Sequence, residues 1–201
     1  RNGSLILVDD QLTPFVEGEV THRAFDQTLD HDGLARSSSG VAGRVGVALD
    51  RGPILTGEIA VGALSENFDA PTLETTRALS VDGSLAWAPT ELVTVSLNGA
   101  TSINPSTDQF SSGSVIYDGS VDLAYAWRRN VPLPGVGELT HERFQGTGLV
   151  DAPYQAGVSA TWKMNRTAWL TAGYLHEWLA SNDPARDYQS DAVRVELRMQ
   201  H

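Results

Sequence analysis

The segment "LSVDGSLAWAPTELVTVSLNGAT" (79–101) decides the fold, because apolar and polar residues alternate on both sides of a short break. Before the break, Leu79, Val81, Leu85 and Trp87 share one parity. After "APTE" (88–91), Val93, Val95 and Leu97 do the same. A period of two is that of a β-strand, with one apolar face and one polar face. The segment therefore predicts two long strands joined by a tight turn.

The same alternation recurs along the whole chain. The predicted strands cover residues 12–25, 39–50, 54–66, 78–88, 91–102, 114–128, 131–144, 153–164, 167–179 and 190–200. The segment 131–144 carries the weakest signal, because Pro132 and Pro134 have no backbone N–H to donate.

The connections between these strands alternate in length. The short ones are 50–53, 88–91, 128–131 and 164–167. The long ones are polar and cover 26–39, 67–78, 103–113, 145–153 and 181–190. This alternation is typical of an up-and-down transmembrane barrel, which has tight periplasmic turns and longer extracellular loops.

A soluble β-sandwich would also alternate, so strand length separates the two architectures. Sandwich strands usually have five or six residues. The strands predicted here have about ten to fourteen, and a tilted strand needs about 9–11 to cross a bilayer. We therefore expect an all-β, up-and-down antiparallel transmembrane β-barrel with at least ten strands.

Composition removes several other classes. The net charge of −11 and the pI near 4.7 leave no electrostatic footprint for nucleic acid. The chain has no cysteine, which removes disulfides, thiol nucleophiles and zinc–thiolate sites. No apolar run approaches the roughly 20 residues of a membrane-spanning helix.

Residues 4–8 have the pattern of the end of an earlier strand. Counting it gives eleven strands, whereas bacterial single-chain barrels have an even number. We expect residues 1–201 to form a single barrel domain that is the C-terminal part of a longer barrel. The alternative is that residues 4–8 are a plug or tether.

Several segments resemble the "β-barrel porin 2"-type outer-membrane proteins of Gram-negative bacteria, which are common in alphaproteobacteria. They include "GRVGVALDRGPILTGEIAVGALSENFD" (43–69), "WRRN" (127–130) and "KMNRTAWLTAGYLHEWLASNDPARDYQ" (163–189). The resemblance covers nearly the whole chain and implies a porin-like barrel in the outer membrane. It carries no catalytic signature and implies no cofactor.

Charged residues fill the polar parity, which faces the lumen in a barrel because charge on the lipid face is costly. The predicted lumen-lining residues are Glu17, Glu19, Arg23, Arg44, Glu58, Asp82, Asp118, Asp122, Arg128, Lys163, Arg194, Glu196 and Arg198. The same polar parity also holds Glu66, Glu138, Glu142 and Glu177. The acidic excess of the whole set indicates a water-filled passage that favours cations. The alternative is a lumen that only satisfies itself through salt bridges across strands.

Aromatic residues and histidines near strand ends predict the interfacial girdles. The predicted girdle residues are His22, Trp87, Trp127, His141, Tyr154, Trp162, His176 and Trp178, and Trp169 has the same kind of position. His22, His141 and His176 all lie on the outward parity of strands that run the same way. They therefore predict a common depth at the outer rim, and not a shared metal or catalytic site.

One loop offers a candidate for chemistry. Asp30, His31 and Asp32 provide an acid–His pair near Ser37–Ser39. Catalysis needs such groups on a rigid support, and these fall in a long polar loop, so we expect no enzyme. The loops also lack the ligand spacing of a calcium loop, so we expect no metal site.

Two functions remain. The first is a passive outer-membrane channel for small solutes. The second is a non-conducting barrel that binds a partner or lipopolysaccharide through its long loops. In either case the expected partners are outer-membrane lipid and lipopolysaccharide, with a protein partner or a second copy also possible and no nucleic acid.

Overall fold

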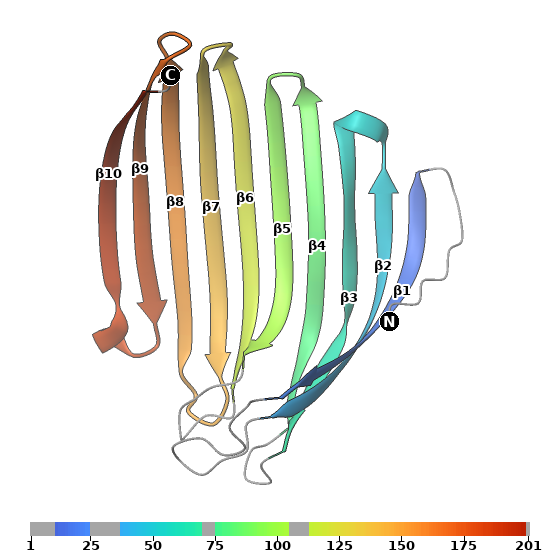
Figure 1. Cartoon of the computed structure of the whole chain (residues 1–201). Coiled ribbons are helices and arrows are strands. Elements are labelled where there is room, and N and C mark those ends of the chain that lie inside the picture. The colour runs from blue at the N-terminus through green and yellow to red at the C-terminus, as the bar shows by residue number, and fades with distance from the viewer. Residues whose placement is uncertain (1–10, 25–36, 70–74, 105–112, 200–201) are drawn as a thin grey trace.

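The computed structural model describes residues 11–24, 37–69, 75–104 and 113–199, which form one antiparallel sheet of ten strands. Each strand pairs with its neighbours in the sequence (Figure 1). The strands are β1 (Leu12–Arg23), β2 (Ser38–Asp50), β3 (Leu55–Phe68), β4 (Thr76–Thr90), β5 (Val93–Asn104), β6 (Ser114–Arg128), β7 (Val131–Phe144), β8 (Val150–Lys163), β9 (Ala168–Ser181) and β10 (Tyr188–Met199). The predicted all-β, up-and-down order is confirmed.

Two short 3₁₀ turns complete the described structure. η1 (Gly52–Ile54) joins β2 to β3, and η2 (Pro184–Arg186) lies between β9 and β10. No helix in the described ranges is long and apolar enough to cross a membrane. The strand ends joined by the short connections all lie at the top of Figure 1, and the opposite ends carry the long connections.

The weakest predicted strand is complete in the structure. β7 covers the predicted range 131–144 despite its two prolines. Pro132 and Pro134 lie opposite Ala126 and Ala124 of β6. The register of β7 with β8 begins only at Gly135. The two prolines therefore lie where β7 pairs with β6 alone, so fewer backbone N–H donors are needed there. The predicted bounds differ most at β8, which begins at Val150 instead of residue 153.

The two faces of the sheet differ in chemistry. The apolar parity is the more exposed one, as for Val16 (50%), Val45 (57%) and Val61 (46%), and lies on the convex face. These three valines and Val81 form one row of directly paired residues across four strands. The polar parity lies on the concave face, where curvature brings the side chains of different strands together.

β1 and β10 are the edge strands of the sheet: the described register pairs β1 with β2 and β10 with β9. The sheet is curved, and the long-connection ends of β1 and β2 bend across the neighbouring strands (Figure 1). Closure into a barrel and insertion into a membrane stay predictions at this point.

Candidate functional site on the concave face

A network centred on Arg44 of β2 connects three strands on the concave face. Its guanidinium Nη1 lies 3.5 Å from Glu17 Oε1 and 3.1 Å from Glu19 Oε2, both on β1. On β4, its Nε lies 2.9 Å from Asp82 Oδ2 and donates to Ser80 Oγ at 2.9 Å. Arg44 is 13% exposed and Ser80 is fully buried, so water screens these contacts only in part. Three acids thus share one cation.

Asp82 extends this network to β5. The register of β4 with β5 shows no direct pair beyond Gly83↔Gly99 toward the long connections. Past that point Asp82 Oδ1 accepts from Thr101 N at 3.0 Å. Thr101 Oγ1 in turn accepts from Val81 N at 2.9 Å and donates to Val81 O at 3.1 Å. Side chains therefore satisfy backbone groups that a ladder would otherwise pair.

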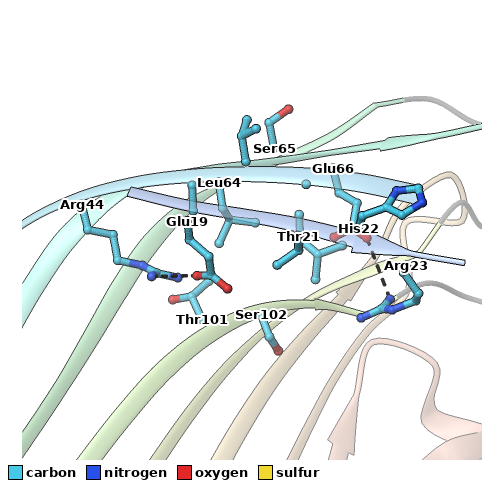
Figure 2. Close-up of a pocket in the computed structure, with 14 residues that line it drawn as sticks. Glu19, Thr21, His22, Arg23, Arg44, Leu64, Ser65, Glu66, Thr101 and Ser102 are labelled. Carbon is cyan, nitrogen blue, oxygen red and sulfur yellow. Dashed lines mark hydrogen bonds and ion pairs between the residues drawn. The ribbon is translucent and has the colours of Figure 1, made fainter. Parts of the chain in front are cut away.

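A cavity of ≈ 370 Å³ lies beside this network, where β1 and β2 bend over the end of β5. Figure 2 shows Glu19 and Thr21 of β1 above Thr101 and Ser102 of β5. At the outer end of the cavity, Glu66 Oε1 lies 3.9 Å from Arg23 Nη1 and accepts from Ser38 Oγ at 2.6 Å.

A second feature of the concave face is a row of directly paired polar residues that crosses eight strands. We call it the acidic row, and its members from β3 to β10 are Glu58, Ser84, Asn98, Ser120, Glu138, Gln155, Glu177 and Ser190. Within the described part of the chain, no basic group lies at ion-pair distance from its three glutamates. Among the described residues the acidic row is therefore negative and uncompensated, in contrast to the Arg44 network.

The remaining predicted lumen residues lie mostly on the same face. Asp118 accepts from Thr140 Oγ1 at 2.6 Å, and Asp122 lies opposite Ser96 and Val136. Arg194 lies 3.4 Å from Glu196 of the same strand. Arg128 is an exception. The register of β6 shifts between Ala126 and Arg128, and the guanidinium of Arg128 lies 4.7 Å from the ring centroid of Trp127. Its guanidinium stacks on Trp127 because the alternation ends at the turn.

Trp169 is a correction to the predicted girdle. It pairs with Lys163 of β8 and Arg198 of β10 on the concave parity. Lys163 Nζ and Arg198 Cζ lie 5.1 and 5.8 Å from its ring centroid. The ring therefore holds two cations by cation–π attraction and does not belong to the outward aromatic set.

The outward aromatic residues lie on the convex parity. Trp87, Trp127 and Trp162 are 46%, 52% and 49% exposed. Tyr154 and Trp178 are stacked with their centroids 5.2 Å apart, and the ring of His176 lies 5.0 Å from that of Trp178. The rings of Tyr154, Trp178 and His176 therefore form one aromatic cluster over β8 and β9.

The three histidines lie on separate strands with separate partners. His22 Nδ1 lies 3.1 Å from Ser39 Oγ, and His141 is paired with Tyr117. His176 Nδ1 lies 2.7 Å from Asp191 Oδ1. In the described ranges no three His, Cys, Asp or Glu side chains gather as a metal site would require. Asp30, His31 and Asp32 lie outside the described residues, as do residues 4–8.

Two further charged groups were absent from the predicted set. Asp151 of β8 is 5% exposed, and its Oδ2 lies 2.6 Å from Arg186 Nη2 in η2. Asp191 of β10 accepts from Tyr174 Oη at 2.6 Å in addition to its contact with His176. Alternation places Asp191 on the outward parity, so the sequence did contain a signal for an acid on that face.

No curated protein matches the chain. The family model described as "Putative beta-barrel porin 2" matches residues 7–201. Membership of a porin family implies, in general terms, a porin-like role and localisation in the outer membrane. Because this model matches nearly the whole chain, which forms ten antiparallel up-and-down strands, the chain belongs to the putative beta-barrel porin 2 family.

Proposed function

We propose that the protein is a passive, water-filled, mildly cation-favouring channel in the outer membrane of a Gram-negative bacterium, and not an enzyme. The observation that carries the proposal is the acidic row. Glu58, Glu138 and Glu177 line the concave face with neutral polar residues between them and no basic partner among the described residues. Rings of uncompensated acids concentrate cations along a pore.

The convex face supports the membrane position. Contiguous apolar patches larger than a few hundred Å² are rare on soluble monomers and mark interaction surfaces. Here the exposed apolar row of Val16, Val45, Val61 and Val81 crosses four strands. The strands have 12 to 15 residues, which is enough for a tilted strand to cross the hydrocarbon and extend beyond it.

The distribution of charge supports the preference for cations. Arg44 is surrounded by Glu17, Glu19 and Asp82, and Arg23 contacts Glu66. Lys163 and Arg198 lie over Trp169 on the strands nearest the β10 edge. The acidic row lies between these two sets of cations, so we propose that a solute passing along it meets mainly carboxylates.

Planar-bilayer recordings in a KCl gradient test this proposal. We expect the wild-type protein to conduct with K⁺ favoured over Cl⁻. The triple variant Glu58→Gln, Glu138→Gln, Glu177→Gln should lower the permeability ratio by roughly two-fold or more, because it removes the uncompensated charge. The matched control is Glu91→Gln, an exposed acid in the short turn between β4 and β5. Equal ratios in the triple variant and the control would contradict the preference.

The Arg44 network favours a second candidate, a non-conducting structural barrel that binds a partner or lipopolysaccharide through its long loops. The ion pairs between Arg44 and three acids fill space on the concave face and hold β1, β2 and β4 together, which suits a packed lumen better than an open one. A protein that enters bilayers, gives no conductance and retains a stoichiometric partner on purification from native membranes would support this candidate.

We also propose that the sheet is part of a larger closed barrel. A free edge of a dozen residues is a template for aggregation, and both β1 and β10 are edges in the described register. Barrels of about eight strands are filled by their own side chains, whereas 16 to 18 strands leave an aqueous channel. The channel proposal therefore fits best with further strands between β1 and β10.

A further inference from the structure

A hollow of ≈ 660 Å³ opens on the convex face over β2, β3 and β4. Its outward-facing residues are Val41, Gly43, Ala63, Ser65, Arg77 and Leu79. A Cβ added at Gly43 would meet nothing within 4 Å, so the floor of the hollow is open to the surroundings. Val41 and Leu79 beside it are 56% and 63% exposed. The hollow is apolar apart from Ser65 and the guanidinium at one end.

The register places this hollow at the outer limit of the apolar surface. Toward the short turns lies the row of four valines that includes Val61. Of the two outward rows that line the hollow, the one farther from the short turns pairs Val41 with Ser65 and Ser65 with Arg77. The next row toward the long connections is polar and contains Ser39 and Asn67. If the valine row faces hydrocarbon, Arg77 lies at the depth of the lipid head groups.

Among the residues that the structure describes, Arg77 has no counter-charge. It is exposed, and no carboxylate among the described residues lies at ion-pair distance from it. Its guanidinium is always charged and has the fork geometry that matches phosphate oxygens. An arginine on the lipid face is costly near the midplane and tolerated close to the interface. An anionic group from the membrane would supply the missing charge.

We propose that this hollow binds a phosphate-bearing lipid of the outer leaflet, with an acyl chain over Gly43 and Ala63 and the phosphate paired with Arg77. The inference rests on the proposed membrane position of the barrel. The hollow has the volume of an ordinary ligand site, about 300–1,000 Å³. The apolar floor of the hollow matches the acyl chain of such a lipid, and Arg77 at the other end matches its phosphate.

Lipid retention tests the site. The protein is placed in phosphatidylcholine nanodiscs with a small fraction of lipid A, and the lipid A retained through purification is measured by mass spectrometry. Arg77→Gln should lower retention about five-fold, the contribution of one basic residue near an anionic lipid surface. Arg77→Lys should keep most of it. Gly43→Leu, which fills the hollow but keeps the charge, should lower retention as well.

The matched control is Arg143→Gln, because Arg143 is also exposed and on the outward parity but lies on β7, outside the hollow. A phosphate-free lipid A should be retained no better by the wild type than by Arg77→Gln. Free inorganic phosphate at millimolar concentration should not displace the lipid, because it lacks the acyl chains. Displacement by free phosphate, or equal losses for Arg77→Gln and Arg143→Gln, would overturn the site.

Conductance and nanodisc entry, measured on the same samples, separate the two proposals. Wild-type protein that enters bilayers and conducts, yet retains lipid A no better than Arg77→Gln does, overturns the lipid site alone. Protein that enters no bilayer overturns the membrane position and the lipid site together.

Discussion

Asp82 is the residue on which the concave-face network depends. Its Oδ2 holds Arg44 and the hydroxyl of Ser80, while its Oδ1 accepts from the backbone of Thr101. Asp82→Asn removes the charge that faces Arg44. It also replaces one of the two carboxylate oxygens, both of which accept hydrogen bonds, with an amide NH₂ group that only donates. We expect a loss of about 1–3 kcal/mol in the free energy of unfolding, the usual cost of an unpaired group in a partly buried network. Urea unfolding in phospholipid vesicles measures it.

The control for Asp82→Asn is Glu196→Gln. Glu196 also contacts an arginine, but Arg194 is 83% exposed and both residues lie on the edge strand β10. Exposed pairs contribute between about zero and 1 kcal/mol. Equal losses in the two variants would mean that the network around Arg44 has no special weight.

Residue alternation predicts the face of a side chain but not its neighbours. Glu17, Arg44 and Asp82 are all assigned to the concave parity by the sequence, yet nothing in it brings them together. Their contacts depend on the register, which pairs Glu17 with Arg44, and on Gly62, which lies between Arg44 and Ser80 in the same row. Trp169 shows the opposite case, since its parity alone separates it from the outward aromatic residues, although only the register pairs it with Lys163.

At the scale of elements, Gly62 fixes the approach of β2 and β3. A Cβ on Gly62 would lie 2.0 Å from Gly43 O and 2.7 Å from Arg44 Cα, and both are backbone atoms that cannot turn aside. Gly62→Ala should therefore force the two strands apart. We expect it to cost about 1–3 kcal/mol, the usual cost of overpacking, and to weaken the contact of Arg44 with Ser80 as well.

Gly43→Ala is the matched control for Gly62→Ala, because Gly43 is adjacent in the same ladder and its added Cβ meets nothing within 4 Å. Heat-modified gel mobility and urea unfolding, measured for both variants, compare the two sites. If the variants unfold at the same urea concentration, Gly62 does not set the strand spacing.

The strands themselves were predictable because each one is long and has one apolar face. Even β7 follows its alternation through two prolines, since the ladder to β8 begins beyond them at Gly135. The sequence did not predict that β5 leaves its ladder with β4 after Gly99. That departure depends on Thr101 replacing backbone partners with its hydroxyl, and a threonine on a strand gives no local sign of such a role.

At the scale of the molecule, the register shows a continuous stagger. One outward row starts at Leu12, the first residue of β1 at the short-turn end, and passes through Leu85 and Leu97. It ends at His176 and Asp191, close to the long-connection ends of β9 and β10. Closed barrels require such a stagger, because their strands are tilted to the axis. The row that contains His176 crosses β7 at Gly137, four residues before His141. His141 and His176 can therefore lie at the same depth in a membrane only if the strands are tilted to the barrel axis.

The same stagger leads to a test of how the barrel closes. Residues 1–201 contain no cysteine, so introduced pairs are the only thiols within them. Val16→Cys with Val45→Cys is the positive control, since these residues are direct partners across β1 and β2. Val16→Cys is then combined in turn with Val193→Cys, Val195→Cys or Leu197→Cys on the outward parity of β10. Directly paired strands lie about 4.8 Å apart, within reach of a disulfide.

If further strands lie between β1 and β10, the control pair should cross-link within one molecule in outer-membrane vesicles, and none of the three β1–β10 pairs should do so. Cross-links between two copies are recognised by their doubled mass. An intramolecular cross-link between β1 and β10 would instead establish a ten-stranded barrel. Its lumen would be largely filled by side chains such as those of the Arg44 network, and the non-conducting candidate would then be favoured over the channel.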